Sequence, residues 1–246
     1  MLIGLSLVVA SGCITNNYTD REIDSKMQRT KHRALVDGTV SARQALIFAS
    51  ILLIIGTLAL FVWTNLLTTL LALFGFIAYV VLYGYAKRKS TYGTLVGSIS
   101  GALPPVIGYT AVSNQLDLAA ALLFIILVCW QMPHFYAIAI YRSADYKAAG
   151  IPVLPVIKGF ATTQYRILAY IAAFTIACTG LVIFGYAGIT YVIPMIVVGI
   201  GWFAIGLKGL TSDEPTTWAK KMFGISLLVI TAFCVTLAVD SYLSNL

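Results

Sequence analysis

Charged residues are scarce in this sequence: Asp, Glu, Lys and Arg together make up 10% of its 246 residues. A water-soluble domain carries about 25% charged residues. Hydrophobic residues make up 60% of the chain, and its mean hydropathy is +0.92, so lipid must be its solvent. Because the bilayer interior offers no water to backbone N–H and C=O groups, the fold must be helical or a closed barrel. Long unbroken apolar runs select helices.

Cysteine is also rare, and its placement excludes a disulfide or zinc framework. The four cysteines lie within apolar runs and form no C-x-x-C pair, so we interpret them as core or lipid-facing residues. The formal net charge is +7, yet no basic face is interleaved with stacking aromatic residues. We therefore expect no nucleic-acid partner.

Apolar runs long enough to cross a bilayer recur along the whole chain. They predict an all-α, polytopic transmembrane helical bundle of about eight spans, with residues 1–246 forming one integral-membrane domain. The predicted spans are 1–18, 44–63, 66–86, 94–112, 118–140, 165–186, 189–208 and 219–242.

The basic residues occupy alternate connections between these spans. All 16 lie in segments 19–43, 87–93, 141–164 and 209–218 or their immediate flanks, whereas the interruptions at 64–65, 113–117 and 185–188 hold none. The positive-inside rule then predicts cytoplasmic basic loops and both termini on the opposite side of the membrane. The expected location is the inner (plasma) membrane.

The first apolar run has two interpretations. It is a transmembrane helix that begins abruptly, as if a preceding piece were missing, or a lipoprotein signal peptide ending at Cys13. No Lys or Arg precedes the run, and Ala10 stands where such a cleavage site prefers Leu, Val or Ile, so we expect the helix.

Oxygen side chains recur every four residues at the end of this run. Asn16, Asp20 and Asp24, called here the oxygen triplet, would lie within about 80° of one another on a helix. Amide and carboxylate oxygens suit Mg²⁺, which binds one or two carboxylates together with substrate phosphates. Arg29 and Arg33 follow closely and could clamp the same phosphates. The alternative is a solvated charge cluster that serves only as a topology anchor.

His134 lies within an apolar run, directly after Pro133. An ionisable residue at membrane depth is a functional candidate, although a core histidine satisfied by a neighbouring carbonyl is the alternative. Asp145, eleven residues later, would share a face with His134 if one helix continued through both.

A third polar segment carries Lys87 and Arg88, placed either to meet an anion at the membrane surface or only to set topology. Shortly after it, Gly93, Gly97 and Gly101 form a small-residue face suited to close helix contact.

Taken together, these blocks resemble the UbiA superfamily of intramembrane prenyltransferases. The resemblance rests on N-x-x-x-D-x-x-x-D followed by M-x-R-T-x-x-R, then Y-x-K-R, S-x-S-G-A-x-P-P-V-I-G-Y, W-Q-M-P-H-F-Y and D-Y-x-x-A-G-I-P-V-L-P, between Asn16 and about Val156. Within the superfamily these blocks are most similar to the haem O synthase branch.

The resemblance implies a lateral cavity in which farnesyl diphosphate ionises and a vinyl group of haem B is alkylated. By carry-over, the oxygen triplet would hold Mg²⁺ and diphosphate, and Arg29, Arg33 and His134 would match positions used by the haem-specific branch. The expected catalytic residues are Asp20, Asp24, Arg29, Arg33 and His134, and the expected diphosphate or haem contacts are Asn16, Asn17, Lys87, Arg88, Arg142 and Asp145. The expected partners are both substrates, the bilayer, and haem A synthase or a haem–copper oxidase assembly.

Two features depart from the superfamily pattern. At the place of a second D-x-x-x-D motif stand Arg142 and Tyr146, with only Asp145 between them, which leaves the number of metal ions open and suggests that Arg142 supplies positive charge. Members of the superfamily also usually have nine helices, and we expect the first of these to be missing here.

The implied mechanism is electrophilic alkylation. Mg²⁺, Lys87, Arg29 and Arg33 would neutralise the leaving diphosphate, and a water-poor cavity would protect the allylic cation. His134 would ligate haem iron or orient the porphyrin, and a role as base is the weaker alternative. Competing functions are polyprenyl transfer to an aromatic or quinone precursor, transport along a path through His134 and Asp145, or a purely structural membrane subunit.

Overall fold

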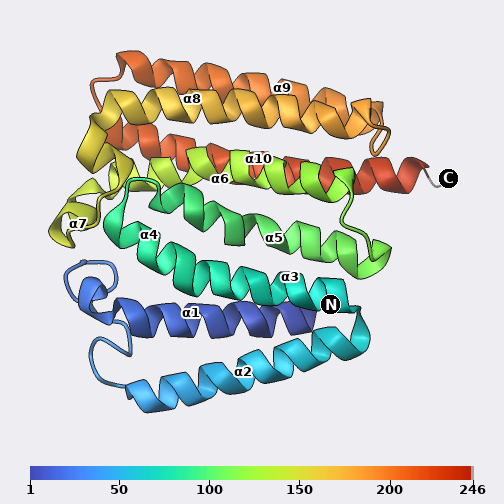
Figure 1. The fold of residues 1–246 in the computed structure, drawn as a ribbon. Helices are drawn as coiled ribbons and strands as arrows, with labels where there is room; N and C mark the ends of the chain where they lie inside the picture. The colour runs from blue at the N-terminus through green and yellow to red at the C-terminus, as the bar shows by residue number, and fades with distance from the viewer. Residues whose placement is uncertain (245–246) are drawn as a thin grey trace. The chain divides into compact units, whose positions relative to one another are not determined.

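The computed structural model describes residues 1–244, and helices account for most of them (Figure 1). The predicted all-α fold class is confirmed. The chain forms two compact units: unit 1 comprises Met1–Leu116 and Ala144–Val153, and unit 2 comprises Asp117–Ser143 and the chain from Leu154 onward.

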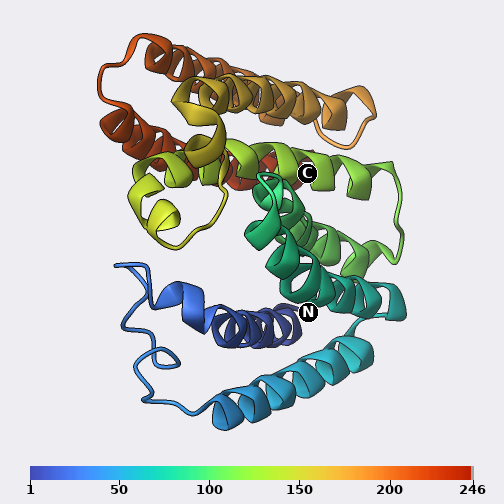
Figure 2. The ribbon, with the colours of Figure 1, turned by 60° about the vertical axis from the view of Figure 1, so that its left-hand side comes forward.

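Unit 1 contains α1 (Leu2–Asp24), α2 (Ala42–Trp63), α3 (Leu66–Ile77), α4 (Gly84–Lys89) and α5 (Gly93–Ser113), together with most of the short α7 (Ser143–Ala148). A π-helical segment (Ala78–Tyr83) joins α3 to α4 without a break. In this unit α1 packs along α2, and α3 packs along α5 (Figures 1 and 2).

Side-chain caps define where the helices of unit 1 begin. Ser41 and Gln44 form a reciprocal capping box at the start of α2, and the Asn65 side chain accepts a hydrogen bond from the Thr68 N–H at the start of α3. Such caps satisfy N–H groups that have no partner within the helix. The polar residues between apolar runs therefore end one helix and begin the next.

Unit 2 contains α6 (Leu118–Tyr141), α8 (Leu154–Ile183), α9 (Ile189–Leu207), a 3₁₀ turn (Lys208–Thr211) and α10 (Pro215–Ser244). Helix α6 packs against α8 and α10, and α9 packs against the same two helices. The core between them is filled by large apolar side chains such as Phe174 and Trp202, whose rings meet edge to face.

Among the described residues, seven helices are long and apolar enough to cross a membrane: residues 42–63, 66–89, 93–113, 118–141, 154–183, 189–211 and 215–244. Each matches a predicted span, so the protein is a multi-pass membrane protein. The eighth predicted span, 1–18, is helical as expected within α1, but it is not among the seven. Polar residues in the last turns of α1, beginning with Asn16 and Asn17, lower its apolar character.

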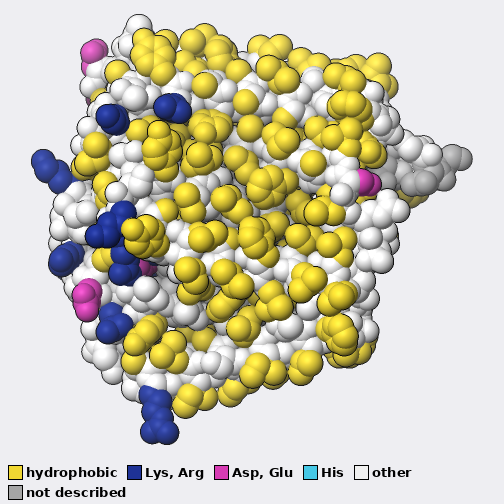
Figure 3. Space-filling model, viewed as in Figure 1, with side chains coloured by type: hydrophobic (Ala, Val, Ile, Leu, Met, Phe, Trp, Pro, Cys, Tyr) yellow, Lys and Arg dark blue, Asp and Glu magenta, His cyan; other side chains and the backbone are white. Residues whose placement is uncertain are grey.

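Hydrophobic side chains make up most of the face shown in Figure 3, on which Lys and Arg side chains are few. In unit 1 the α1–α2 connection and the last turn of α4 carry basic residues, whereas the α2–α3 connection carries none. In unit 2, Lys208 follows the end of α9, and Lys220 and Lys221 lie in the first turns of α10, whereas the α8–α9 connection holds no basic residue. Successive helices of a unit run in opposite directions, so alternate connections lie at the same end of that unit. The basic residues near alternate connections therefore lie at one end.

Three local expectations need revision. Helix α8 begins at Leu154, well before the predicted residue 165, and is kinked at Gly159, where φ is +79°. Helix α6 ends at Tyr141, and α7 begins anew at Ser143, so the idea that one helix aligns His134 with Asp145 is wrong. The small-residue face is shorter than predicted, because Gly93 and Gly97 make close contacts while Gly101 is exposed.

Candidate active site

The oxygen triplet lies on the last turns of α1, at the end where the basic α1–α2 connection begins. Asp20 is only 7% exposed and Asp24 only 4%. Carboxylates are almost never this buried unless they are paired, because removing a charge from water is costly. The partners of these two residues therefore define the site.

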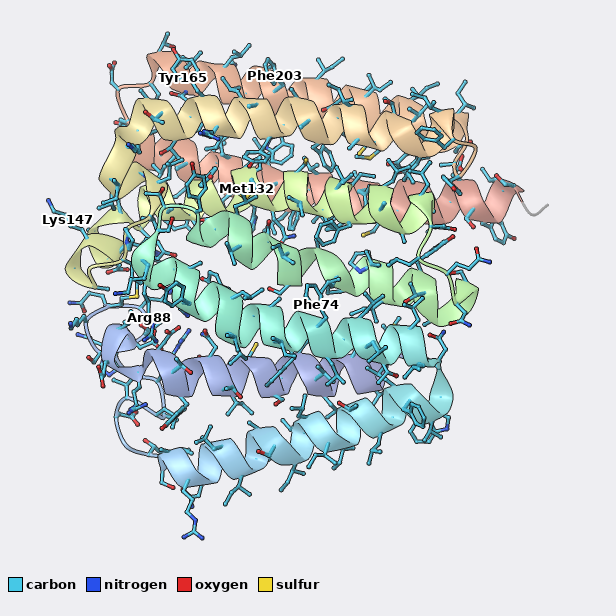
Figure 4. All side chains as sticks on the ribbon, viewed as in Figure 1. Phe74, Arg88, Met132, Lys147, Tyr165 and Phe203 are labelled. Atoms are coloured by element: carbon cyan, nitrogen blue, oxygen red, sulfur yellow. The ribbon has the colours of Figure 1, made fainter. Side chains whose placement is uncertain are left out.

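Asp20 is paired with two cations from α4. The Lys87 ammonium contacts Asp20 Oδ2, and it also donates to Asn16 Oδ1 at 2.7 Å. Arg88 Nη2 donates to Asp20 Oδ1 at 2.9 Å and to the Thr19 carbonyl at 2.7 Å. Figure 4 shows Arg88 at the end of α4, close to α1. Asp20 thus accepts two charge-assisted hydrogen bonds, one on each oxygen.

Asp24 is paired with Arg33 from the loop that follows α1. Arg33 Nη1 donates to Asp24 Oδ2 at 2.6 Å and to Asn17 Oδ1 at 2.9 Å. Residues 25–40 form successive turns rather than a helix, which is what lets Arg33 reach back sixteen residues to Asn17. The Thr30 hydroxyl donates to the Asp24 carbonyl at 3.0 Å and anchors the loop.

The far part of this loop is held by Asp37. Its carboxylate accepts hydrogen bonds from the Thr39 N–H at 2.9 Å and from the Thr39 hydroxyl at 2.5 Å. These bonds favour the charged form and hold the pKa of Asp37 below its usual range. The loop that presents Arg33 therefore has an ordered turn of its own.

Lys87 is positioned by close packing between α4 and α5. A Cβ atom on Gly93 would lie 2.6 Å from the Lys87 Cα, and one on Gly97 would lie 2.8 Å from the Tyr83 ring. The Lys87 ammonium also lies 4.8 Å from the centroid of the Tyr83 ring, within the range of a cation–π contact. Glycine at 93 and 97 is what lets the lysine and the tyrosine approach α5.

Tyr79 and Tyr83 extend this arrangement and were not predicted as site residues. Their rings stack with centroids 5.7 Å apart and an interplanar angle of 12°. In an α-helix, residues four apart advance by about 40° around the axis, and the wider π-helical turns between Ala78 and Tyr83 offset that advance. The spacing of Tyr79, Tyr83 and Lys87, four residues apart each time, was the available signal in the sequence.

The structure thus brings together seven of the predicted site residues in unit 1: Asn16, Asn17, Asp20, Asp24, Arg33, Lys87 and Arg88. Arg29 lies in the same loop but is exposed, and it makes no hydrogen bond or ion pair with the described part of the chain. Asp145 lies on α7, also within unit 1.

His134 belongs to unit 2, where α10 holds it. Its Nδ1 lies 2.7 Å from the Ser226 hydroxyl, and its ring packs between Trp130 and Phe223 at centroid distances of 5.0 and 4.8 Å. The Ser226 hydroxyl donates its one proton to the Phe223 carbonyl at 2.6 Å, so it must accept from His134 Nδ1–H. The neutral imidazole then has its lone pair on Nε2, which makes no hydrogen bond within residues 1–244. Arg142, also in unit 2, follows α6 directly.

A pocket of about 540 Å³ opens beside the Asn17–Arg33 pair, between α1, α2 and their connecting loop. Apolar side chains, among them Ile14, Leu35 and Phe48, form much of its lining. Its volume lies in the range of small-molecule sites.

The donor set of the triplet fits a hard cation. Within the described residues no three His, Cys, Asp or Glu side chains gather as a metal site, so the protein side supplies two carboxylates and amide oxygens. Mg²⁺ commonly binds through one or two carboxylates and completes its shell with phosphate and water oxygens. The Lys87 ammonium, which contacts Asn16 Oδ1 and Asp20 Oδ2 together, shows that these two oxygens converge on positive charge.

A family model described as the UbiA prenyltransferase family matches residues 1–230. The chain belongs to this family. UbiA membership confirms the resemblance drawn from the sequence blocks, and it makes the chain a membrane prenyltransferase.

Two relatives of this UbiA chain carry the same name. The "Protoheme IX farnesyltransferase" of Yersinia pseudotuberculosis serotype O:1b is 51% identical over 240 residues, which cover 97% of this chain and 81% of the relative. The protein of that name from Edwardsiella ictaluri is 50% identical over 245 residues, covering 99% and 83%.

Solved structures support the UbiA fold. A UbiA homologue from Aeropyrum pernix K1 aligns with a TM-score of 0.75 at 21% identity, covering 97% of this chain and 87% of that one. A UbiA homologue from Archaeoglobus fulgidus bound to GPP and Mg²⁺ aligns with a TM-score of 0.59 at 17% identity, covering 97% and 89%.

Proposed function

We propose that this chain transfers the farnesyl group of farnesyl diphosphate to a vinyl group of protohaem IX (haem B), giving haem O and diphosphate, with residues 1–246 acting as one catalytic domain. The observation that carries the proposal is the 51% identity, over 97% of the chain, with a protein named for this activity. The paired triplet at the end of α1 supplies the polar site that such a reaction needs.

The diphosphate is proposed to bind at the triplet together with Mg²⁺. Asn16, Asp20 and Asp24 would hold the metal, which supplies positive charge against the charge that develops on the leaving diphosphate. The support is the oxygen chemistry of the triplet and the GPP and Mg²⁺ named for the A. fulgidus homologue.

The chain's own cations would share this task. Lys87, Arg88 and Arg33 already lie within hydrogen-bond distance of the triplet, and the exposed Arg29 has its guanidinium available for phosphate oxygens. Preorganised donors aimed at developing charge stabilise a transition state strongly because they need no reorganisation. The surrounding apolar helices would keep water from the allylic cation.

His134 is proposed to meet the haem. With Nδ1–H held by Ser226, the Nε2 lone pair suits ligation of haem iron, because a metal-binding imidazole commonly donates its other N–H to a fixed acceptor. Arg142 and Asp145 are proposed as further contacts to diphosphate or haem. The enzyme would lie in the inner membrane, with its basic loops facing the cytoplasm. Its product would pass to haem A synthase or a haem–copper oxidase assembly.

The proposal is tested with membranes that contain the full chain. They are incubated with haem B, farnesyl diphosphate and Mg²⁺, and the extracted pigment is analysed by mass spectrometry. We expect haem O, and none when any one of the three is omitted. Prenylation of an aromatic acid or quinone precursor in place of haem would overturn the choice of acceptor. Uptake of unchanged solute by proteoliposomes, with no product formed, would point to a transporter instead.

The His134 assignment predicts a selective effect on haem. We expect Ser226→Ala to raise the KM for haem B by about 2- to 10-fold, because a hydrogen bond of about 0.5–1.5 kcal/mol that fixes the imidazole is lost. His134→Ala should raise it further. Neither change should alter the KM for farnesyl diphosphate, and Ser226→Thr, which keeps the hydroxyl, serves as the control. An equal rise in both KM values would show that the pair only supports the fold.

A further inference from the structure

Both buried carboxylates of the triplet are already paired with cations of the chain. Asp20 is paired with Lys87 and Arg88, and Asp24 is paired with Arg33. The Lys87 side chain is only 8% exposed, so water screens its pair with Asp20 poorly. Any metal that binds the triplet must therefore compete with cations that are built into the protein.

The competition is most direct at Lys87. Its ammonium contacts Asn16 Oδ1 and Asp20 Oδ2 at once, and these are the two oxygens that the proposed metal would share. A metal ion and the Lys87 ammonium cannot both occupy the position beside these two oxygens, because the two positive charges repel each other. Lysine can move aside, because it is a compact charge on a flexible four-carbon stem.

Neither the metal ion alone nor the diphosphate alone can replace one partner of the Asp20–Lys87 pair favourably. A metal that takes Asp20 leaves Lys87 buried without a counter-charge, and a diphosphate that takes Lys87 leaves Asp20 with fewer partners. Removing one member of a buried ion pair is strongly unfavourable because the remaining charge is uncompensated. When both ligands arrive, the carboxylates face the metal and the cations face the phosphate oxygens.

We infer that Lys87, Arg88 and Arg33 act as exchangeable counter-ions, so that metal and diphosphate bind cooperatively and the metal alone binds weakly. This inference rests on the proposed function, since it takes the triplet as the metal and diphosphate site. Cooperativity is reciprocal: the factor by which diphosphate strengthens metal binding equals the factor by which metal strengthens diphosphate binding. We expect a factor of about 10 or more.

The test measures metal binding and needs no turnover. The purified full chain in detergent is dialysed to equilibrium against Mn²⁺, with and without inorganic pyrophosphate, and the excess Mn²⁺ on the protein side is quantified by electron paramagnetic resonance after acid release. Free Mn²⁺–pyrophosphate crosses the dialysis membrane, so its concentration is equal on both sides and does not contribute to the measured excess. The wild-type chain should bind Mn²⁺ at least about tenfold more tightly with pyrophosphate present.

A variant isolates the role of the lysine. Lys87→Gln should bind Mn²⁺ alone at least about tenfold more tightly than the wild type, because Asp20 loses a competing ammonium. Lys89→Gln removes an exposed lysine two residues away, with the same change in net charge, and should behave as the wild type. Arg33→Gln removes the cation that pairs with Asp24 and should likewise strengthen the binding of Mn²⁺ alone. It replaces the first variant if Lys87→Gln folds poorly.

The outcomes separate the inference from the function beneath it. Equally tight wild-type Mn²⁺ binding with and without pyrophosphate would overturn the counter-ion exchange and leave the metal site standing. Unchanged binding in both Lys87→Gln and Arg33→Gln would overturn it as well. No bound Mn²⁺ under any condition would instead remove the triplet as a metal site, and with it this part of the proposed function.

Discussion

Asp20→Ala and Asp24→Ala should each abolish the conversion of haem B to haem O, lowering the rate by about 10²- to 10³-fold or more. Losing one preorganised electrostatic group typically costs a factor of this size. Asp20→Ala removes a proposed metal ligand and also strands the buried Lys87. The rate is measured as haem O formed per unit of enzyme, with the amount of chain in the membrane determined by immunoblot.

The matched control for these variants lies on the same helix. Glu22 stands between the two aspartates on α1, but its side chain is exposed and makes no ion pair or hydrogen bond with the residues of the site. Glu22→Ala should therefore leave the rate nearly unchanged. Full turnover by Asp20→Ala or Asp24→Ala, at normal membrane abundance, would refute the metal-site assignment.

Gly93→Ala should lower the rate of haem O formation by about 10²-fold, although it introduces only a methyl group. The new Cβ would lie 2.6 Å from the Lys87 Cα and 3.1 Å from the Lys87 backbone nitrogen, so α4 and α5 must separate. A displacement of about 1 Å at a catalytic group can cost a factor of this order. The change should also cost about 1–3 kcal/mol of stability, as overpacking commonly does.

Gly84 provides the comparison for this second variant. It lies at the start of α4, three residues before Lys87, and a Cβ there would meet nothing within 4 Å. Gly84→Ala should keep both activity and the midpoint of thermal unfolding in detergent close to the wild-type values. If Gly93→Ala behaved the same way, close α4–α5 packing would not be what positions Lys87.

The sequence predicted much of the fold because the signals are local. Seven apolar runs match seven helices of bilayer length, and polar residues such as Ser41 and Asn65 mark where helices begin. The predictions failed where they extended a helical spacing past the end of a helix. Helix α6 ends at Tyr141 and α7 begins at Ser143, and residue spacing alone did not reveal this break.

The site was predictable in part. Asn16, Asp20 and Asp24 repeat every four residues on one helix, so their shared face followed from spacing. Tyr79 and Tyr83 were missed because tyrosines in a membrane helix are usually explained by packing or interfacial belts. Ser226 was beyond reach, since the hydrogen bond to His134 joins residues 92 positions apart and no local pattern marks it.

By itself the sequence determined that this is a multi-pass helical membrane protein of the UbiA family with an oxygen triplet at the end of its first helix, because hydropathy, helical period and motif spacing are properties of neighbouring residues. Only the tertiary structure decided which cation meets which carboxylate. Asp20 pairs with Lys87, 67 residues away, in a structure where Gly93 lets α4 pack closely on α5. Asp24 pairs with Arg33 because the chain after α1 turns back on itself. Such pairings depend on where the backbone places each buried charge, and burial then requires the pair to form.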